Sequence, residues 1–380
     1  MKITDIRTRL LERPLDGSIR NPRFPWTVKR SLLTFVEIED GRLGVGESWV
    51  DGAAGDSIIA HIASEVRPAL IGEDARLPER HFKAAIDRAV VSTRRSQTWA
   101  AMSAVDIALW DLKAQAAGEP LWRLLGGNDP RVLPYASAGL YRAGQTPDEF
   151  AEEYAAYVRQ GFRAVKIKVG GAPLAVDVER VAKLRAAMGP EARLMVDGVS
   201  IYDVPRAIAF AKAVQPYDIY WFEQPLPIED VAGMTRIHTL GGIPLCGIEN
   251  DYGLWSFRRL LEEDAVHYVQ FDPIISGGVT YGRKIAALAE AYFKPVTLHH
   301  SNSVVSMLAN IHLAASLPNA DSVELHVFHQ PLFQHAPPGA LELRDGFLHA
   351  PELPGLGVDA HALERAILAG AAVPVGAAAE

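Results

Sequence analysis

The chain has 380 residues, a formal net charge of −8 and one cysteine, Cys246. This acidic balance excludes a sequence-independent nucleic-acid binder, which needs a basic face. A lone cysteine allows no internal disulfide and suits a reducing cytoplasm. No apolar run approaches the ~20 residues of a membrane span. We therefore expect a cytoplasmic protein with small-molecule partners, and neither nucleic acid nor membrane among them.

The first part of the chain, residues 1–125, is expected to form an α+β capping domain. Residues 1–50 contain strand-like runs, and Asp40-Gly41 separates two of them as a tight hairpin turn does, because Gly accepts positive φ. The segment from Asp16 to Arg30 is rich in turn formers and cations, which indicates a mobile loop. From residue 56 to Gly118, apolar residues recur at helical spacing.

Eight strand-like runs then alternate with helical stretches. They are LPYASAGLY, AVKIKVG, RLMVDG, YWFEQP, PLCGIEN, YVQFDP, PVTLHH and SVELH. This alternation predicts an α/β fold, a closed parallel barrel of the TIM type over residues 126–330, with its site at the C-terminal strand ends. Residues 331–380 are expected to return to the capping domain, and their end, AAVPVGAAAE, to be frayed.

Three consecutive runs each end in a single acid, Asp197, Glu223 and Glu249. Both intervals are 26 residues, about the length of one strand–helix unit, so the carboxylates are predicted to lie side by side. One such acid alone could cap the following helix, but three in phase in an apolar pocket need a compensating cation. Oxygen-only ligands favour Mg2+ or Mn2+ over zinc. Counting back from Glu249, strand alternation predicts that Cys246 points away from the barrel axis.

Two lysines on the second run, Lys166 and Lys168, share one face because they are two residues apart. Both ammonium groups are therefore predicted to enter the interior that holds the acids. Each lowers the pKa of the other and burial lowers it further, so one could serve as a neutral base near pH 7. Alternatively, both extend to solvent and neutralise the acids.

The sixth and seventh runs supply Asp272 and His299, which are 27 residues apart. The carboxylate could orient the imidazole and stabilise its cation, as a catalytic His–Asp pair requires. A histidine at a strand end can also be structural. His300 competes for the role, but alternation turns only one of the two inward. Glu324, near the end of the eighth run, is either a hydrogen-bonding acid or an ion-pair partner.

As an ordered set, these motifs resemble the enolase superfamily, and specifically its mandelate racemase subgroup. The resemblance covers nearly the whole chain, including DIALWDLKAQAAGEPLWRLLGG, which looks like the helix that leads into the barrel of that family. It implies a modified (β/α)7β barrel with a cap formed by both ends of the chain. It also implies a homo-oligomer, either a dimer or an octamer.

The resemblance implies a role for every residue of the set. The three strand-end acids become the ligands of one Mg2+ per subunit. Lys168 becomes a base on one face of the substrate, with Lys166 as a cation beside it. His299, paired with Asp272, becomes the acid/base on the opposite face, and Glu324 a hydrogen-bond donor to the developing enolate.

The implied chemistry is removal of a proton α to a carboxylate. The leading prediction is a dehydratase that converts a sugar acid, an aldonate or aldarate, to a 2-keto-3-deoxy acid. A racemase or epimerase of a 2-hydroxy acid and a sugar-acid lactone cycloisomerase are alternatives, and a non-catalytic barrel is a fourth. The family usually has an Asn two residues after the first metal acid, where this chain has Val199, which cannot make the same contact.

Polar residues at the predicted barrel mouth favour a hydroxylated substrate. The predicted substrate contacts are Lys166, Glu324, Arg20, Arg23, Trp26 and Ser301. Such groups suit hydroxyls and a second carboxylate, although they could also be solvated loop residues. Phe24, Trp26 and Trp49 keep an aromatic hydroxy acid as an alternative.

Overall fold

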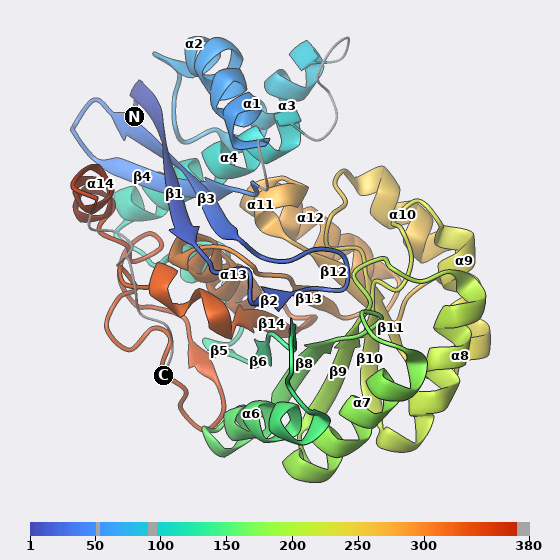
Figure 1. Cartoon of the computed structure of the whole chain (residues 1–380). Coiled ribbons are helices and arrows are strands. Elements are labelled where there is room, and N and C mark those ends of the chain that lie inside the picture. Colours follow the sequence, from blue (N-terminus) through green and yellow to red (C-terminus); the bar gives the residue numbers. More distant parts are fainter. Residues whose placement is uncertain (51–53, 90–96, 371–380) are drawn as a thin grey trace.

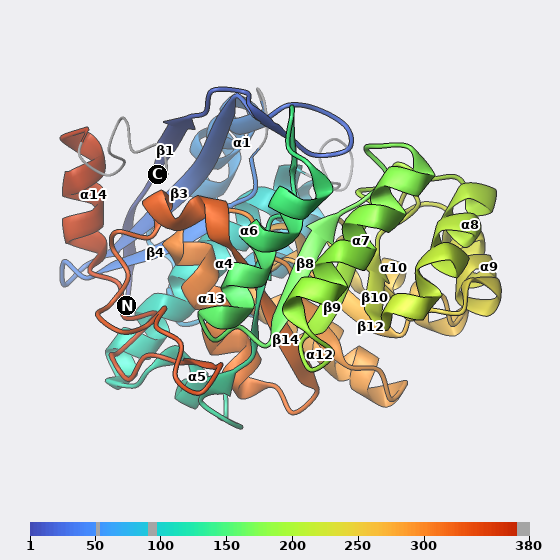
Figure 2. The same ribbon diagram turned by 60° about the horizontal axis from the view of Figure 1, so that its bottom comes forward.

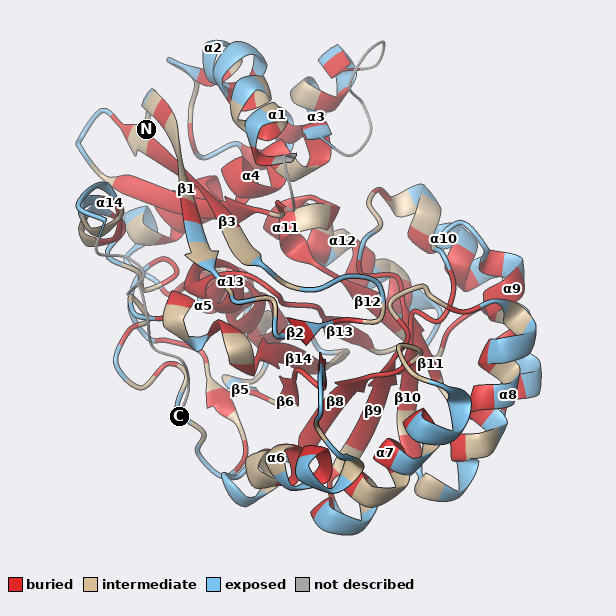
Figure 3. Cartoon of the chain, viewed as in Figure 1, coloured by how far each residue is buried: buried red, intermediate tan, exposed pale blue. Residues whose placement is uncertain are grey.

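The computed structural model of the protein describes residues 1–50, 54–89 and 97–370. The predicted frayed end, 371–380, lies outside the described residues, and so does the 90–96 stretch of the predicted helical region. Figure 1 shows a ring of strands surrounded by helices, with the N-terminal sheet and its helices lying beside the ring. The barrel strands are buried, while the outer sides of the surrounding helices are exposed (Figure 3).

The capping domain is built on an antiparallel sheet with the order β1-β3-β4. Its strands are β1 (Ile3–Pro14), β3 (Val28–Ile38) and β4 (Leu43–Ser48). The predicted hairpin is confirmed, since β3 pairs with β4 and Gly41 between them has a φ of +84°. Helix α4 (Gln97–Ala117) packs on β4. Glycine permits this close packing, because a Cβ at Gly46 would lie 1.9 Å from the carbonyl oxygen of Ala104.

Short helices complete the cap and share one apolar core with the sheet and α4. They are α1 (Ala54–His61), η1 (Ile62–Val66), α2 (Arg67–Leu70) and α3 (Pro78–Arg88). Within the part of the chain that the structure describes, none of the helices has the length and apolar character to cross a bilayer.

Eight parallel strands close into a barrel, and each of the eight predicted runs overlaps one of them. In chain order they are β6 (Pro134–Ser137), β8 (Ala164–Lys168), β9 (Arg193–Asp197), β10 (Ile219–Glu223), β11 (Leu245–Gly247), β12 (Tyr268–Phe271), β13 (Val296–Leu298) and β14 (Ala320–His326). Strand β14 pairs with β6 and so closes the ring. The predicted α/β class and TIM-type barrel are confirmed.

Within the described residues, each barrel strand is followed by an α-helix except the last, which leads into a short 3-10 helix. These helices are α6 (Pro147–Arg159), α7 (Leu174–Met188), α8 (Val204–Val214), α9 (Val231–Gly241), α10 (Leu254–Glu262), α12 (Gly278–Ala291), preceded by the short α11 (Pro273–Ser276), and α13 (Val304–Ser316). Local signals start them: Thr146 and Glu149 form a reciprocal capping box ahead of α6, with Pro147 in its first turn.

Below the strand ends, the barrel interior is filled by large side chains. Cys246 belongs to this layer, in a buried cluster with Tyr135, Ala164, Met195 and Trp221. The prediction that Cys246 points away from the barrel axis is therefore wrong. Strand β11 ends at Gly247, so alternation counted back from Glu249 does not follow a continuous strand. Burial raises the pKa of the Cys246 thiol well above its usual value, which keeps it protonated.

After β14 the chain passes through η4 (Val327–Leu332) and returns to the capping domain. Helix α14 (Ala360–Leu368) lies beside β1 and β4 (Figure 2). There Glu364 forms ion pairs with Arg7 at 2.7 Å and with Arg9 at 2.8 Å. On the way, β15 (Leu348–His349) pairs with β5 (Arg131–Val132), just before the barrel begins. The domain boundaries near residues 125 and 330 stay predictions.

A buried carboxylate, Asp106, joins the cap to the barrel. It lies on α4 and accepts hydrogen bonds from Thr280 at the start of α12, 2.9 Å from the backbone N and 2.5 Å from Oγ1. Burial raises the pKa of Asp106 to about 7, against these hydrogen bonds.

We predict that this group makes the protein less stable as pH rises. Between the unfolded pKa of about 4 and the folded pKa of about 7, the folded state holds a proton that the unfolded state has lost, so the free energy of unfolding falls by about 1.4 kcal/mol per pH unit. Unfolding titrations of the wild type and of Asp106→Asn across this range would measure the difference. Parallel pH profiles for the two proteins would contradict the prediction.

Candidate active site

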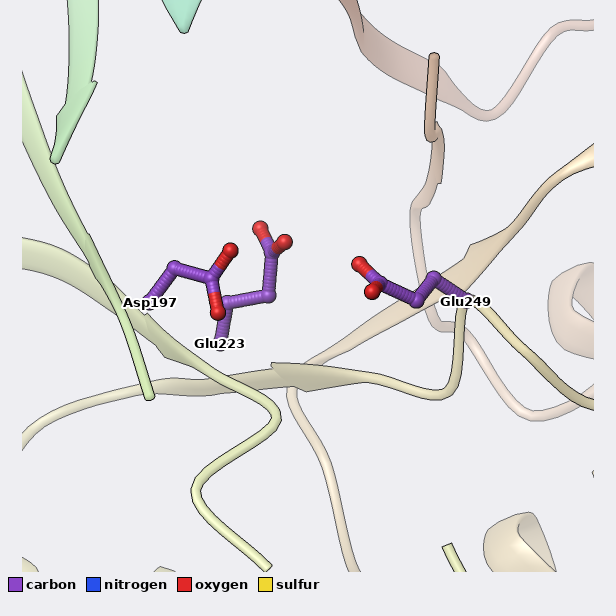
Figure 4. Close-up of side chains that lie close together, drawn as sticks. All are labelled: Asp197, Glu223 and Glu249. Carbon is purple, nitrogen blue, oxygen red and sulfur yellow. The ribbon is translucent and has the colours of Figure 1, made fainter. Parts of the chain in front are cut away.

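Three carboxylates meet at the C-terminal ends of adjacent barrel strands. Asp197 and Glu223 are the last residues of β9 and β10, and Glu249 follows β11. One oxygen from each lies within 4.8 Å of the others, and Figure 4 shows the three side chains pointing toward one another. The strand-end spacing in the sequence therefore places these three acids together.

This cluster fits a divalent cation. All three side chains are buried, with Glu249 the most exposed at 8%. Among the described residues, the Oε2 atoms of Glu223 and Glu249 have no hydrogen-bond partner. Buried carboxylate oxygens without partners are costly, and hard oxygen ligands suit Mg2+ or Mn2+.

The two lysines of β8 face these acids. Lys166 is fully buried, forms an ion pair with Glu223, and lies 3.0 Å from Glu324 and 3.5 Å from Asp197. Lys168 pairs with Asp197. Burial lowers the pKa of both lysines, but the facing carboxylates outweigh it and raise both above the usual value. The structure thus contradicts the prediction of a neutral lysine. The attraction of the nearby carboxylates raises each lysine pKa by more than burial and the second lysine lower it.

His299, rather than His300, faces the acids, and strand alternation predicts that only one of the two does so. Its Nδ1 lies 2.7 Å from Asp272 Oδ2, and its Nε2 lies 3.6 Å from Glu249 and 3.7 Å from Glu324. Burial lowers the pKa of His299, but these three carboxylates reverse the effect and raise it to about 9. The imidazole is therefore protonated near pH 7. His300 turns away to the carbonyl oxygen of Ser303 at 3.1 Å.

Glu324 sits between the lysines and His299. Burial raises its pKa, but Lys166, His299 and Lys168 hold that pKa well below its usual value. As a carboxylate it accepts hydrogen bonds in this arrangement, so the donor role implied by the family resemblance requires it to gain a proton. Tyr135 donates to Glu324 from 3.3 Å. Tyr135 is not among the predicted site residues because it lies mid-strand in β6, below the strand ends that the sequence pattern marks.

Patterns of known families match most of the chain. The family described as "Mandelate racemase / muconate lactonizing enzyme, N-terminal domain" matches residues 22–126, and "Enolase C-terminal domain-like" matches residues 149–364. The chain belongs to the mandelate racemase subgroup of the enolase superfamily.

Relatives within the enolase superfamily span several reactions. The chain is 33% identical over 357 residues to a 3,6-anhydro-alpha-L-galactonate cycloisomerase from Streptomyces coelicolor, covering 94% of this chain and 96% of that protein. It is 30% identical over 326 residues to an arabinonate dehydratase from Saccharolobus solfataricus, covering 86% and 87%. A solved structure described as a racemase from Streptomyces coelicolor A3(2) with bound magnesium has a TM-score of 0.87 at 31% identity, covering 96% of this chain and 99% of that one.

The predicted loop of the cap lies against the barrel in this superfamily member. Its short strand β2 (Ile19–Arg20) pairs with β7 (Tyr141–Arg142), which follows β6. Arg20 donates to the carbonyl oxygen of Gly171 at 2.8 Å, and Arg23 to those of Val199, at 2.6 Å, and Ser200. The structure therefore places Arg20 and Arg23 on barrel loops and not on the acid cluster. Their role in binding substrate stays a prediction.

Three other cap residues reach the site or its surroundings. Lys29 lies 4.5 Å from the centre of the Trp49 ring and 3.4 Å from Ser301 Oγ, and Trp49 lies 5.8 Å from the ring of His299. Glu47 of β4 is fully buried and accepts from Ser303 Oγ at 2.7 Å and from Ser306 N at 3.0 Å. Glu47 is absent from the predicted site residues, because its partners lie 256 and 259 residues away.

Val199, which replaces the usual family Asn, has a backbone φ of +47°. Its N–H donates to Asp197 Oδ1 at 2.8 Å, so the conformation helps to hold the first acid. Asn adopts such left-handed conformations more readily than a β-branched residue does.

We predict that Mg2+ stabilises the fold through the acid cluster. Millimolar Mg2+ should raise the thermal midpoint of the wild type, because a cation that binds only the folded state adds its binding free energy. Glu223→Gln, which removes one charge, should lose most of this shift and still fold. Equal shifts in the two proteins would show that Mg2+ acts elsewhere.

We also predict that Val199→Asn stabilises the protein by about 1 kcal/mol, because it relieves the left-handed strain. Val199→Thr is the matched control, since it keeps the β-branch and should give no gain. Chemical unfolding of the three proteins measures the effect. A gain in Val199→Thr as large as that in Val199→Asn would rule out backbone strain as the cause.

Proposed function

We propose that this protein is a sugar-acid dehydratase. It removes the proton α to the carboxylate of an aldonate or aldarate and expels the β-hydroxyl as water. The resulting enol becomes a 2-keto-3-deoxy acid. The observation that carries the proposal is the grouping of a three-acid cluster with Lys168 on one side and the His299–Asp272 pair on the other.

In this proposal, Asp197, Glu223 and Glu249 hold one Mg2+ per subunit, for which Mn2+ can substitute. Bound there, the cation supplies the positive charge that acidifies the α C–H of a carboxylate substrate and stabilises the enediolate. The buried Oε2 atoms of Glu223 and Glu249, which have no hydrogen-bond partner among the described residues, support this assignment.

Lys168 and His299 divide the proton transfers between them. Their strands, β8 and β13, are three positions apart around the closed ring, so the two side chains approach a bound substrate from different directions. Lys168 takes the α proton, which requires that Asp197, its present partner, finds another counter-ion. His299 is protonated and held by Asp272, so it can donate to the departing β-hydroxyl.

Lys166 and Glu324 complete the proposed site. Lys166 is a fully buried ammonium beside Glu223 and Glu324, and places positive charge where the enediolate develops. Glu324, its partner, accepts hydrogen bonds from substrate until it gains a proton. Trp26, Ser301, Arg20 and Arg23 remain proposed substrate contacts from the cap and the turn after His299.

A lactone cycloisomerase is the second candidate, favoured by the 33% identity to the cycloisomerase relative. It begins with the same proton abstraction, as does a racemase or epimerase, so the proton-transfer residues are common to all three. A non-catalytic barrel would have no need to keep the full set. We further propose a homo-oligomer, dimer or octamer, in the cytoplasm, with domain boundaries near residues 125 and 330.

The reaction class is tested with a panel of aldonic and aldaric acids in the presence of Mg2+. We expect at least one acid to give a 2-keto-3-deoxy product that a carbonyl reagent detects, and a chelator to abolish the reaction. Inversion at the α carbon without carbonyl formation would favour the racemase, and ring opening of a lactone would favour the cycloisomerase.

The two proton-transfer groups are tested by single substitutions. Lys168→Ala and His299→Ala should each lower kcat by about 10^2- to 10^4-fold, the usual scale for a positioned acid or base. Exchange of the α hydrogen with solvent deuterium should vanish in Lys168→Ala and persist in His299→Ala. Undiminished exchange in the double variant would refute the assignment of Lys168, and an unchanged kcat in His299→Ala would refute that of His299.

A further inference from the structure

His326 is a buried side chain near the site to which the proposed mechanism gives no role. It ends β14 two residues beyond Glu324, so both side chains lie on the same face of the strand. The residue is only 2% exposed, and neither ring nitrogen has a hydrogen-bond partner among the described residues. Two unpaired polar atoms at such depth are costly unless a ligand satisfies them.

The ring of His326 is held by aromatic contacts, while its two nitrogens have no hydrogen-bond partner among the described residues. It stacks on His329 with ring centres 4.2 Å apart, and its centre lies 5.3 Å from that of Trp26 on the cap loop. His329 is already engaged, because its Nε2 lies 3.1 Å from Ser301 Oγ. His326 is thus fixed in orientation without using its own hydrogen-bonding capacity.

Both stacked histidines are neutral near pH 7. Burial lowers the pKa of His326 and that of His329 well below the usual value, and Lys29 on the cap lowers them further. A neutral imidazole offers one N–H donor and one nitrogen acceptor. Either nitrogen can bond to an alcohol hydroxyl, which accepts from the N–H or donates to the other nitrogen, whereas a carboxylate only accepts and a methylene does neither.

We propose that His326 recognises a hydroxyl group on the distal part of the substrate, beyond the two carbons that react. The position follows from the strand, because two residues along β14 correspond to a rise of about 6–7 Å from Glu324 toward the cap. This proposal rests on the proposed function and narrows its substrate class to acids that carry hydroxyls past C3. His326 would then determine specificity without taking part in proton transfer.

The test measures binding, so that it does not depend on turnover. Calorimetry with Mg2+ present compares a panel of hexonates with 2,3-dihydroxyhexanoate, which keeps the reacting hydroxyls and lacks the distal ones. The wild type should bind its best hexonate at least about 10-fold more tightly than the deoxy acid. His326→Phe keeps the ring stack and should reduce that ratio to near one, with affinity for the deoxy acid nearly unchanged. His326→Gln, which retains a donor and an acceptor, should preserve most of the ratio.

A second readout addresses folding. Because His326→Phe removes two unpaired buried polar atoms, its ligand-free thermal midpoint should equal or exceed that of the wild type. A wild-type ratio near one, an unchanged ratio in His326→Phe, or an equal loss of affinity for both acids would overturn the inference. Discrimination in binding without any carbonyl product would refute only the proposed dehydratase.

Discussion

Compensation of buried charge is the constraint on which the barrel mouth depends. When all are ionised, five carboxylates face three cationic side chains there. The net charge of −2 that remains is the charge that one divalent cation neutralises. These groups are Asp197, Glu223, Glu249, Asp272 and Glu324, with Lys166, Lys168 and His299. Each is tolerated because the others are present, so the charges act as one unit and not as separate ion pairs.

The barrel satisfies this constraint through its regular geometry. Parallel strands all end at the same rim, so single residues far apart in the chain meet without any special local conformation. This is why the fold and the acid cluster could be predicted from sequence: equal spacing indicated the three acids, and two-residue alternation grouped the lysines and allowed only one of His299 and His300 to face inward. Both rules depend only on backbone periodicity, which short segments of sequence reveal, whereas the choice of His299 came from the family resemblance.

What could not be predicted depends on contacts between distant segments or on where a strand ends. The direction of Cys246 was predicted wrongly because β11 ends at Gly247, and the apolar pattern alone does not mark that end. The protonation of Lys168 follows from a contact with Asp197 that no spacing measures. The alternation that grouped Lys166 with Lys168 could also have grouped His326 with Glu324. The role proposed for His326, however, rests on ring nitrogens without hydrogen-bond partners, which only the folded structure reveals.

The hydrogen bonds of Glu47 have a consequence for how this architecture can change. Glu47 belongs to the capping domain, yet it accepts hydrogen bonds from Ser303 and Ser306 at the start of the helix that follows the His299 turn. Exchanging the capping domain with that of a relative would therefore alter the support of His299, the proposed acid, as well as the cover of the proposed substrate site. A chimera that transfers a new cap onto this barrel needs an acceptor at position 47, so substrate range and catalytic competence are inherited together.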